Sequence, residues 1–321
     1  MKFPVFDLHC DTALALLGDD FAQMGDLRHN QLHIDLTRAK ELGGYCQCFA
    51  CFTTPDMEKW CGKSPLIVFE RELSTIMRET EKNGDLIGLA YSSDEIEENR
   101  NNGKMSAVLT IEGPAGFGYD PELLEDLYHV GFRITTLGWN EQNVLCGSNV
   151  TGGGLTDLGR EYVKKAQELG MIVDVSHISD EAFWDIMEIA EAPVIASHSN
   201  SRAVHDHSRN LTDEMFLAIC KTGGVVGINL YADFLGNNAT LETVCDHILH
   251  FLSLDPDGAH IALGGDLDGC ERLPKGFTGI QDYNLLAEAL LARGISQEMV
   301  YGIFWNNAMG VMKHAVSIHK R

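Results

Sequence analysis

The sequence predicts a (β/α)8 barrel with parallel strands, and two observations support this fold. Short apolar runs of β character alternate with longer segments whose apolar residues have helical spacing. Such alternation is typical of a parallel sheet covered by helices. The 321 residues contain eight of these strand segments, and the length is in the usual range for a closed barrel. We therefore expect a single barrel domain over residues 1–321.

The predicted strands are short, apolar segments spaced along the whole chain. They cover residues 3–9, 45–52, 106–112, 132–137, 171–177, 193–198, 224–231 and 260–266. The intervening helical patterns cover residues 65–83, 156–170, 179–192, 212–224, 239–254, 283–294 and 306–319. Thr156 and Ser179 are suitable N-cap residues, and Gly170 is a suitable helix stop.

An open, doubly wound parallel sheet is the alternative fold. Such sheets often carry a glycine-rich phosphate-binding turn after the first strand. The sequence contains neither GxGxxG nor GxxxxGK[ST], so the barrel is favoured.

The composition is acidic, with a formal net charge of −23. A surface this negative repels nucleic acids and anionic membranes. The sequence has no apolar run long enough for a transmembrane helix and no recognisable export signal. The nine cysteines have no disulfide-framework spacing, which predicts a reduced, cytoplasmic protein. Cys46, Cys48 and Cys51 are interpreted as core residues, with a zinc site there as the less favoured alternative.

Polar residues stand where several predicted strands end. Barrel enzymes place their chemistry at the carboxyl ends of the strands. The residues found there that are typical metal ligands are His9, Asp11, Glu112, His177 and His198. Each alone has an ordinary structural explanation, such as a capping or hydrogen-bonding role. Their joint occurrence at four strand ends predicts a metal site.

The spacing suggests how two ions would share these ligands. His9 and Asp11 are two residues apart and would chelate one ion, while His177 and His198 would hold another. Glu112 lies between the two pairs in barrel order and can bridge the ions through its two oxygens. Asp7 alternates with His9, so we expect it on the same face of the strand, supporting a ligand histidine. Of the other histidines, His205 and His207 are candidates for substrate contact.

Five motifs together resemble the membrane dipeptidase (renal dipeptidase) family of metallopeptidases. They are "DLHCDT" at 7–12, "IEG" at 111–113, "DVSH" at 174–177, "SHSNSRAVHDHSRN" at 197–210 and "GGDLDG" at 264–269. They occur in the order of the family and span nearly the whole chain. The resemblance implies an amidohydrolase-type barrel, a dipeptide substrate and a homodimer.

The resemblance also implies individual roles. The five ligands named above match two divalent ions, with zinc as the preferred metal. Asp266 matches the aspartate that handles protons, Arg209 the arginine that binds the substrate carboxylate, and Tyr231 a substrate-contacting tyrosine. Asp268 is a candidate for holding the substrate ammonium. A histidine of the mammalian members has no counterpart here, because Trp139 or Asn140 stands at that position.

The sequence therefore predicts a metal-dependent hydrolase, a zinc dipeptidase in which a metal-bridging hydroxide attacks the peptide bond of L,L- and L,D-dipeptides. The first alternative is the same site acting on another small amide, lactone or ester, because this type of barrel serves many substrates. The second is a catalytically silent metal- or partner-binding barrel. Arg209 favours the dipeptidase, since a lactone needs no carboxylate clamp.

Overall fold

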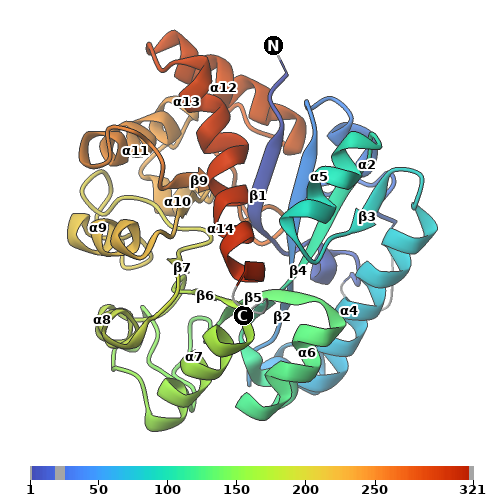
Figure 1. Ribbon diagram of the computed structural model, residues 1–321, viewed down its shortest axis with the longest axis vertical. Helices are drawn as coiled ribbons and strands as arrows, with labels where there is room; N and C mark the ends of the chain where they lie inside the picture. The colour runs from blue at the N-terminus through green and yellow to red at the C-terminus, as the bar shows by residue number, and fades with distance from the viewer. Residues whose placement is uncertain (1, 19–25, 318–321) are drawn as a thin grey trace.

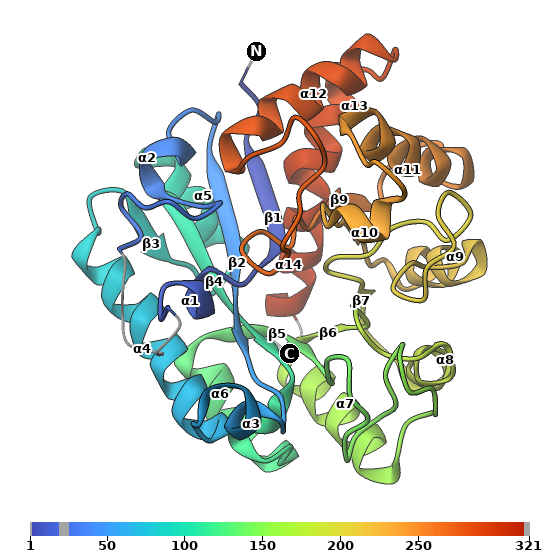
Figure 2. The ribbon, with the colours of Figure 1, turned by 180° about the vertical axis from the view of Figure 1, so that it is seen from behind.

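The computed structural model describes residues 2–18 and 26–317, without the side chains of 314–317. The strands are β1 (Val5–Cys10), β2 (Tyr45–Phe52), β3 (Ile87–Leu89), β4 (Met105–Glu112), β5 (Phe132–Thr136), β6 (Ile172–Asp174), β7 (Val194–Ile195), β8 (Val226–Ile228) and β9 (Ile261–Leu263). All pairings between them are parallel, in the order β7-β6-β5-β4-β2-β1-β9-β8. A parallel bridge between Ala196 and Val226 connects the two ends of this order. The predicted (β/α)8 barrel is thus confirmed, and Figures 1 and 2 show its helices outside the strands.

Several of the longer helices begin at a side-chain cap and bury an apolar face. They are α1 (Thr12–Ala15), α2 (Leu36–Ala39), α3 (Met57–Cys61), α4 (Pro65–Lys82), α5 (Ser93–Asn101), α6 (Leu124–Val130), α7 (Asp157–Leu169), α8 (Asp180–Ile189), α9 (Asp213–Thr222), α10 (Ala232–Leu235), α11 (Leu241–Leu254), α12 (Tyr283–Ala292), α13 (Gln297–Tyr301) and α14 (Asn307–Ser317). As predicted, the side chains of Thr156 and Ser179 cap α7 and α8, and Gly170 ends α7 with a positive φ of 82°. None of the described helices is long and apolar enough to cross a membrane.

One strand was not expected from the sequence. β3 has three residues and pairs only with the first half of β4, while β5 pairs with the second half. It therefore extends the sheet below β5 without adding a strand to the closed barrel. Its short length and its central Gly88 give it no clear strand pattern.

The strands of the second half of the barrel are shorter than the sequence predicts. β6, β7, β8 and β9 have only two or three residues each. The polar residues that follow them leave the hydrogen-bonded ladder, and His177 and Asp266 adopt positive φ angles of 72° and 55°. Such conformations are uncommon for residues with a Cβ, and they turn these side chains into the barrel mouth.

The barrel interior is apolar below the strand ends. Phe6, Val108 and Ile172 from different strands pack together with Trp305, which lies in a π-helical turn (Gly302–Asn306) before α14. α14 crosses the barrel in Figure 1 and contributes to the same cluster. Cys46 and Cys48 also belong to it and are fully buried, which agrees with their interpretation as core residues. Polar groups are therefore gathered at the opposite, carboxyl end of the strands.

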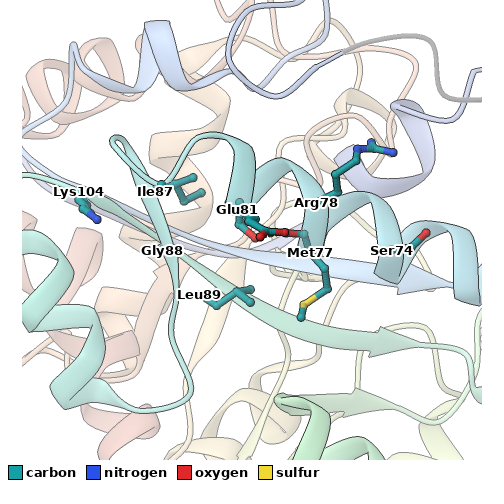
Figure 3. Close-up of a pocket in the computed structure, with 10 residues that line it drawn as sticks. Ser74, Met77, Arg78, Glu81, Ile87, Gly88, Leu89 and Lys104 are labelled. Carbon is teal, nitrogen blue, oxygen red and sulfur yellow. Dashed lines mark hydrogen bonds between the residues drawn. The ribbon is translucent and has the colours of Figure 1, made fainter.

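A surface cleft of about 630 Å³ lies between α4 and β3 (Figure 3). Met77 and Leu89 line it, and Lys104 stands at one end. Because Lys104 directly precedes β4, the cleft lies near the amino ends of the strands. It is therefore separate from the polar strand ends.

The close approach of β8 and β9 to the chain after β7 depends on glycine. A Cβ at Gly264 would lie 1.7 Å from the carbonyl oxygen of Ser197. We expect Gly264→Ala to lower the free energy of unfolding by about 2–3 kcal/mol, because the backbone must shift to remove this clash. Urea denaturation followed by circular dichroism measures the change.

The matched control is Gly310→Ala in α14, where no neighbouring atom lies within 4 Å of the added Cβ. This variant should gain up to about 1 kcal/mol from helix propensity. Equal stability of the two variants would contradict the account of how the barrel closes.

Candidate metal centre

His9 reaches the barrel mouth through an irregularity in β1. The register between β1 and β2 shifts between Asp7 and Cys10, so three residues of β1 span two of β2. Such a bulge changes the face on which the following side chains lie. His9 Nε2 lies 3.5 Å from Asp11 Oδ2 and 3.3 Å from Glu112 Oε2. The structure thus brings the predicted first pair of ligands together with Glu112.

The expectation that Asp7 lies on the same face as His9 is wrong. Asp7 is buried against α12, where its carboxylate accepts a hydrogen bond from the Tyr283 hydroxyl. It also accepts from the backbone amides of His9 and Gly265, each at 3.0 Å. The bulge is the physical reason, because it breaks the simple alternation along β1. Asp7 therefore fixes the backbone on both sides of the site and does not contact a ligand ring.

Glu112, the last residue of β4, lies between the two histidine groups. Its Oε2 faces His9, while its Oε1 lies 3.0 Å from His177 Nε2 and 3.8 Å from His198 Nε2. Burial raises the pKa of Glu112, but the neighbouring His9 and His177 outweigh burial and hold the pKa below its usual range. One ionised carboxylate can therefore serve two cation positions, as the sequence predicts.

The rings of His177 and His198 are oriented by hydrogen bonds on their outer nitrogens. His198 Nδ1 lies 2.7 Å from Ser197 Oγ, which in turn donates to Asp174 Oδ2. His177 Nδ1 lies 3.1 Å from Asn140 Oδ1. Because the hydroxyl already donates to a carboxylate and the amide oxygen only accepts, both Nδ1 atoms act as donors. Each Nε2 is then left with a lone pair directed into the barrel mouth.

Because both Nε2 atoms carry lone pairs, they face one another without a hydrogen between them. The Nε2 atoms of His177 and His198 are only 2.9 Å apart, and Glu112 Oε1 is beside them. Burial lowers the pKa of His177 to about 4 and that of His198 well below its usual value. Neutral imidazoles are the form that binds metals. Buried acceptors that face one another are unfavourable, and a divalent cation bound between them would stabilise the group.

The position near His9 also favours positive charge. His9 Nε2 is buried and has no hydrogen-bond partner. Burial lowers its pKa, but the Glu112 and Asp11 carboxylates outweigh burial and raise it. Among the described residues, two groups of three have ligand atoms within 4.8 Å of one another, namely His9 with Glu112 and His198, and His9 with Asp11 and Asp266. The residues present therefore fit divalent metal ions.

Asp266 lies at the edge of the ligand cluster, with Oδ1 3.9 Å from His9 Nε2. Its other oxygen accepts a hydrogen bond from Asn229 Nδ2 at 3.1 Å. Burial raises the pKa of Asp266 to about 7, while His9 lowers it. A carboxyl group with such a pKa exchanges protons near neutral pH.

Arg209 is a buried cation above the ends of β7 and β8. Its guanidinium donates to the His198 carbonyl at 3.3 Å and stacks 5.3 Å from the Phe234 ring. Its Nε is buried without a partner, and no carboxylate pairs with it in the described part of the chain. A buried guanidinium with unused donors is suited to a carboxylate ligand.

The remaining predicted substrate residues gather around Phe234. Tyr231 packs edge-on against Phe234 at 4.7 Å, and His207 lies 4.7 Å from the same ring. His207 Nδ1 also accepts from the backbone amide of Arg209, while His205 stacks on His207 at 6.3 Å. These residues lie beside Arg209, as their predicted contact with the substrate requires.

The expectation for Asp268 changes, and Asn140 makes a contact that the sequence did not predict. Asp268 cannot hold a substrate ammonium, because its side chain is only 2% exposed. Its oxygens accept from the Thr12 hydroxyl and from the His33 backbone amide, both at 2.6 Å. Asn140, one of the two residues at the position of the mammalian histidine, uses its side-chain oxygen to orient His177. The sequence did not reveal the roles of Asp174 and Ser197, although both lie inside the motifs quoted above.

A parallel barrel with candidate histidine and carboxylate ligands at its strand ends is typical of the class of metal-dependent hydrolases. Within this class, the model of the membrane dipeptidase family (Peptidase family M19) matches residues 1–321. The chain belongs to this family of metallo-dipeptidases, which confirms the family predicted from the motifs.

Individual relatives agree with this assignment. An uncharacterized dipeptidase of Schizosaccharomyces pombe is 36% identical over 216 residues, covering 65% of this chain and 53% of that protein. The chain thus spans about half the length of this relative. A second uncharacterized dipeptidase of the same yeast is 30% identical over 306 residues, covering 88% of this chain and 72% of that protein. A metallopeptidase of Rhodobacter sphaeroides, solved with a phosphinate mimic of L-Ala-D-Ala, has the same fold, with a TM-score of 0.87 at 24% identity over 98% of this chain and 100% of that chain.

The hydrogen bond from His198 to Ser197 makes a specific prediction. Ser197→Ala removes the group that orients the ring, so we expect metal affinity to fall about 10- to 100-fold. Competition with a fluorescent chelator measures this affinity. Ser74→Ala on the exposed face of α4 is the control and should bind metal like the wild type. An unchanged affinity in Ser197→Ala would contradict the orienting role.

Proposed function

We propose that this chain is a dinuclear zinc dipeptidase that hydrolyses L,L- and L,D-dipeptides. The observation that carries the proposal is the convergence of two neutral imidazoles and one shared carboxylate, which leaves buried lone pairs facing one another. Zinc is the preferred metal because imidazole nitrogen and carboxylate oxygen are its usual ligands in catalytic sites. The names of both yeast relatives, which call them dipeptidases, support the activity.

We assign the metal-binding residues to two positions that share Glu112. His9 and Asp11 would hold one ion, and His177 and His198 the other. Bound ions supply Lewis-acid polarisation of the peptide carbonyl and a water molecule that is nucleophilic near neutral pH. The protein supplies the fixed geometry, because the ligand side chains are all buried.

The other site residues bind substrate and move protons. Arg209 would pair with the carboxylate of the second residue of the dipeptide, and burial strengthens this pairing. Asp266 would accept a proton from the attacking water at Oδ1 and pass it to the leaving amine. Its position at the edge of the ligand cluster supports this role. A carboxylate clamp close to the scissile bond leaves room for only one residue on the amine side of that bond.

The alternative is the same centre acting on another small amide, lactone or ester. Arg209 separates the two functions, because only a substrate with a free carboxylate uses a buried cation. The catalytically silent metal- or partner-binding alternative is disfavoured, because a protein freed from catalysis has no physical need for an open two-metal site.

Arg209→Ala tests the proposal. We expect kcat/KM for dipeptides to fall on the order of 100-fold or more, because a buried charge pair is lost, while the metal content stays unchanged. The control is Arg160→Ala in α7, since the Arg160 guanidinium pairs with Asp185 on α8, outside the metal centre. Kinetic assays with L-Ala-L-Ala, L-Ala-D-Ala and the carboxamide of L-Ala-L-Ala measure the effect.

The carboxamide provides the decisive comparison. The wild type should discriminate strongly between the dipeptide and its carboxamide, and Arg209→Ala should lose this discrimination. Full dipeptidase activity in Arg209→Ala, or hydrolysis of a lactone in preference to any dipeptide by the wild type, would contradict the proposal.

A further inference from the structure

Three aromatic side chains form a continuous surface beside the metal centre. Phe52 ends β2, Trp60 lies in α3, and Trp139 follows β5. The Trp60 and Trp139 rings meet edge to face at 5.2 Å, and Phe52 lies 5.3 Å from Trp139 and 6.2 Å from Trp60. We call this group the aromatic wall. It reaches the metal centre directly, because Trp139 lies 6.1 Å from the ring of His177.

The aromatic wall is separate from the main core of the barrel. Phe52 belongs to a small cluster with Met57 and Val68, against which Trp139 packs. Met57 and Val68 are buried, so they close the cluster from the inside. Trp60, in contrast, leaves 53% of its surface exposed. Trp60 contacts Trp139, which in turn contacts His177, so a half-exposed tryptophan one ring away from the buried polar centre provides an apolar surface for a ligand.

The aromatic wall and Arg209 lie on opposite sides of the metal centre. The wall stands above β2 and β5, whereas Arg209 contacts the carbonyl of His198 after β7 and the Phe234 ring after β8. In the closed barrel order, β6 with the following His177 lies between these two regions on one side, and β1 with His9 and β9 lie between them on the other. A dipeptide bound by its carboxylate to Arg209 must place its peptide bond at the metal centre. Its first residue then extends toward the wall.

We propose that the aromatic wall binds the side chain of the first residue of the dipeptide, and that the enzyme prefers a large apolar or aromatic residue at this position. This inference rests on the proposed dipeptidase function and adds the substrate class. Ring packing explains the preference, because a large apolar side chain removes both its own surface and that of Trp60 from water. A small first residue leaves Trp60 exposed and therefore gains little binding free energy from it.

The test compares substrates that differ only in the place of the large residue. kcat/KM is measured for L-Phe-Gly, Gly-L-Phe and Gly-Gly with the wild type, Trp60→Ala and Trp60→Phe. The wild type should cleave L-Phe-Gly with a kcat/KM about tenfold or more above that for Gly-Gly. Trp60→Ala should lower the ratio of these two values about tenfold, and Trp60→Phe should restore most of it. Because Trp60 is half exposed, Trp60→Ala should remain folded. Circular dichroism checks that the variant is folded.

Trp184→Ala is the matched control. Trp184 is 46% exposed, like Trp60, but it lies on α8 in the outer ring of helices (Figure 1). Its removal should leave the substrate ratio unchanged. An unchanged ratio in Trp60→Ala, an equal fall in Trp184→Ala, or a preference for Gly-L-Phe would overturn the aromatic wall alone. Absence of hydrolysis of every dipeptide by the metal-loaded wild type would overturn the proposed function as well.

Discussion

The structure of the site depends on the buried carboxylate of Glu112 and the imidazole nitrogens that surround it. Glu112 Oε2 faces His9, and Glu112 Oε1 faces His177. The outer nitrogens of His177 and His198 donate hydrogen bonds to Asn140 Oδ1 and Ser197 Oγ, so the inner lone pairs point at one another. Without a cation, this arrangement is a concentration of buried acceptors, which is energetically unfavourable. A bound divalent cation would resolve this conflict, and the hydrogen bonds on the outer nitrogens would hold the rings in place for it.

The barrel positions these side chains through short strands and through buried carboxylates that bind the backbone beside them. Asp7 connects the amides of His9 and Gly265, which precedes Asp266. Asp174 accepts hydrogen bonds from the hydroxyls of Thr136 and Ser197 and from the backbone amide of Ser176. Both aspartates are buried and hold backbone or hydroxyl groups rather than ions. The sequence motifs of the family therefore combine ligands with the residues that position them.

The sequence predicted the barrel strands and the cluster of polar residues at their ends, because parallel strands bring their carboxyl ends to one face. It failed where local geometry breaks a simple rule. Alternation placed Asp7 beside His9, but the bulge in β1 separates them. Asp268 appeared available for substrate, but Thr12 and His33, which are far from it in the sequence, occupy its oxygens. Trp60 lies in a five-residue helix with no recognisable motif, so only the fold shows that it adjoins Trp139.

We propose that Glu112 is shared by two metal ions. The most direct measurement is anomalous X-ray diffraction at the zinc absorption edge from crystals of the zinc-loaded protein. The account predicts two peaks about 3.5–4 Å apart, with one Glu112 oxygen on each ion, His9 and Asp11 on the first, and His177 and His198 on the second. A single peak, or two ions without Glu112 between them, would contradict it.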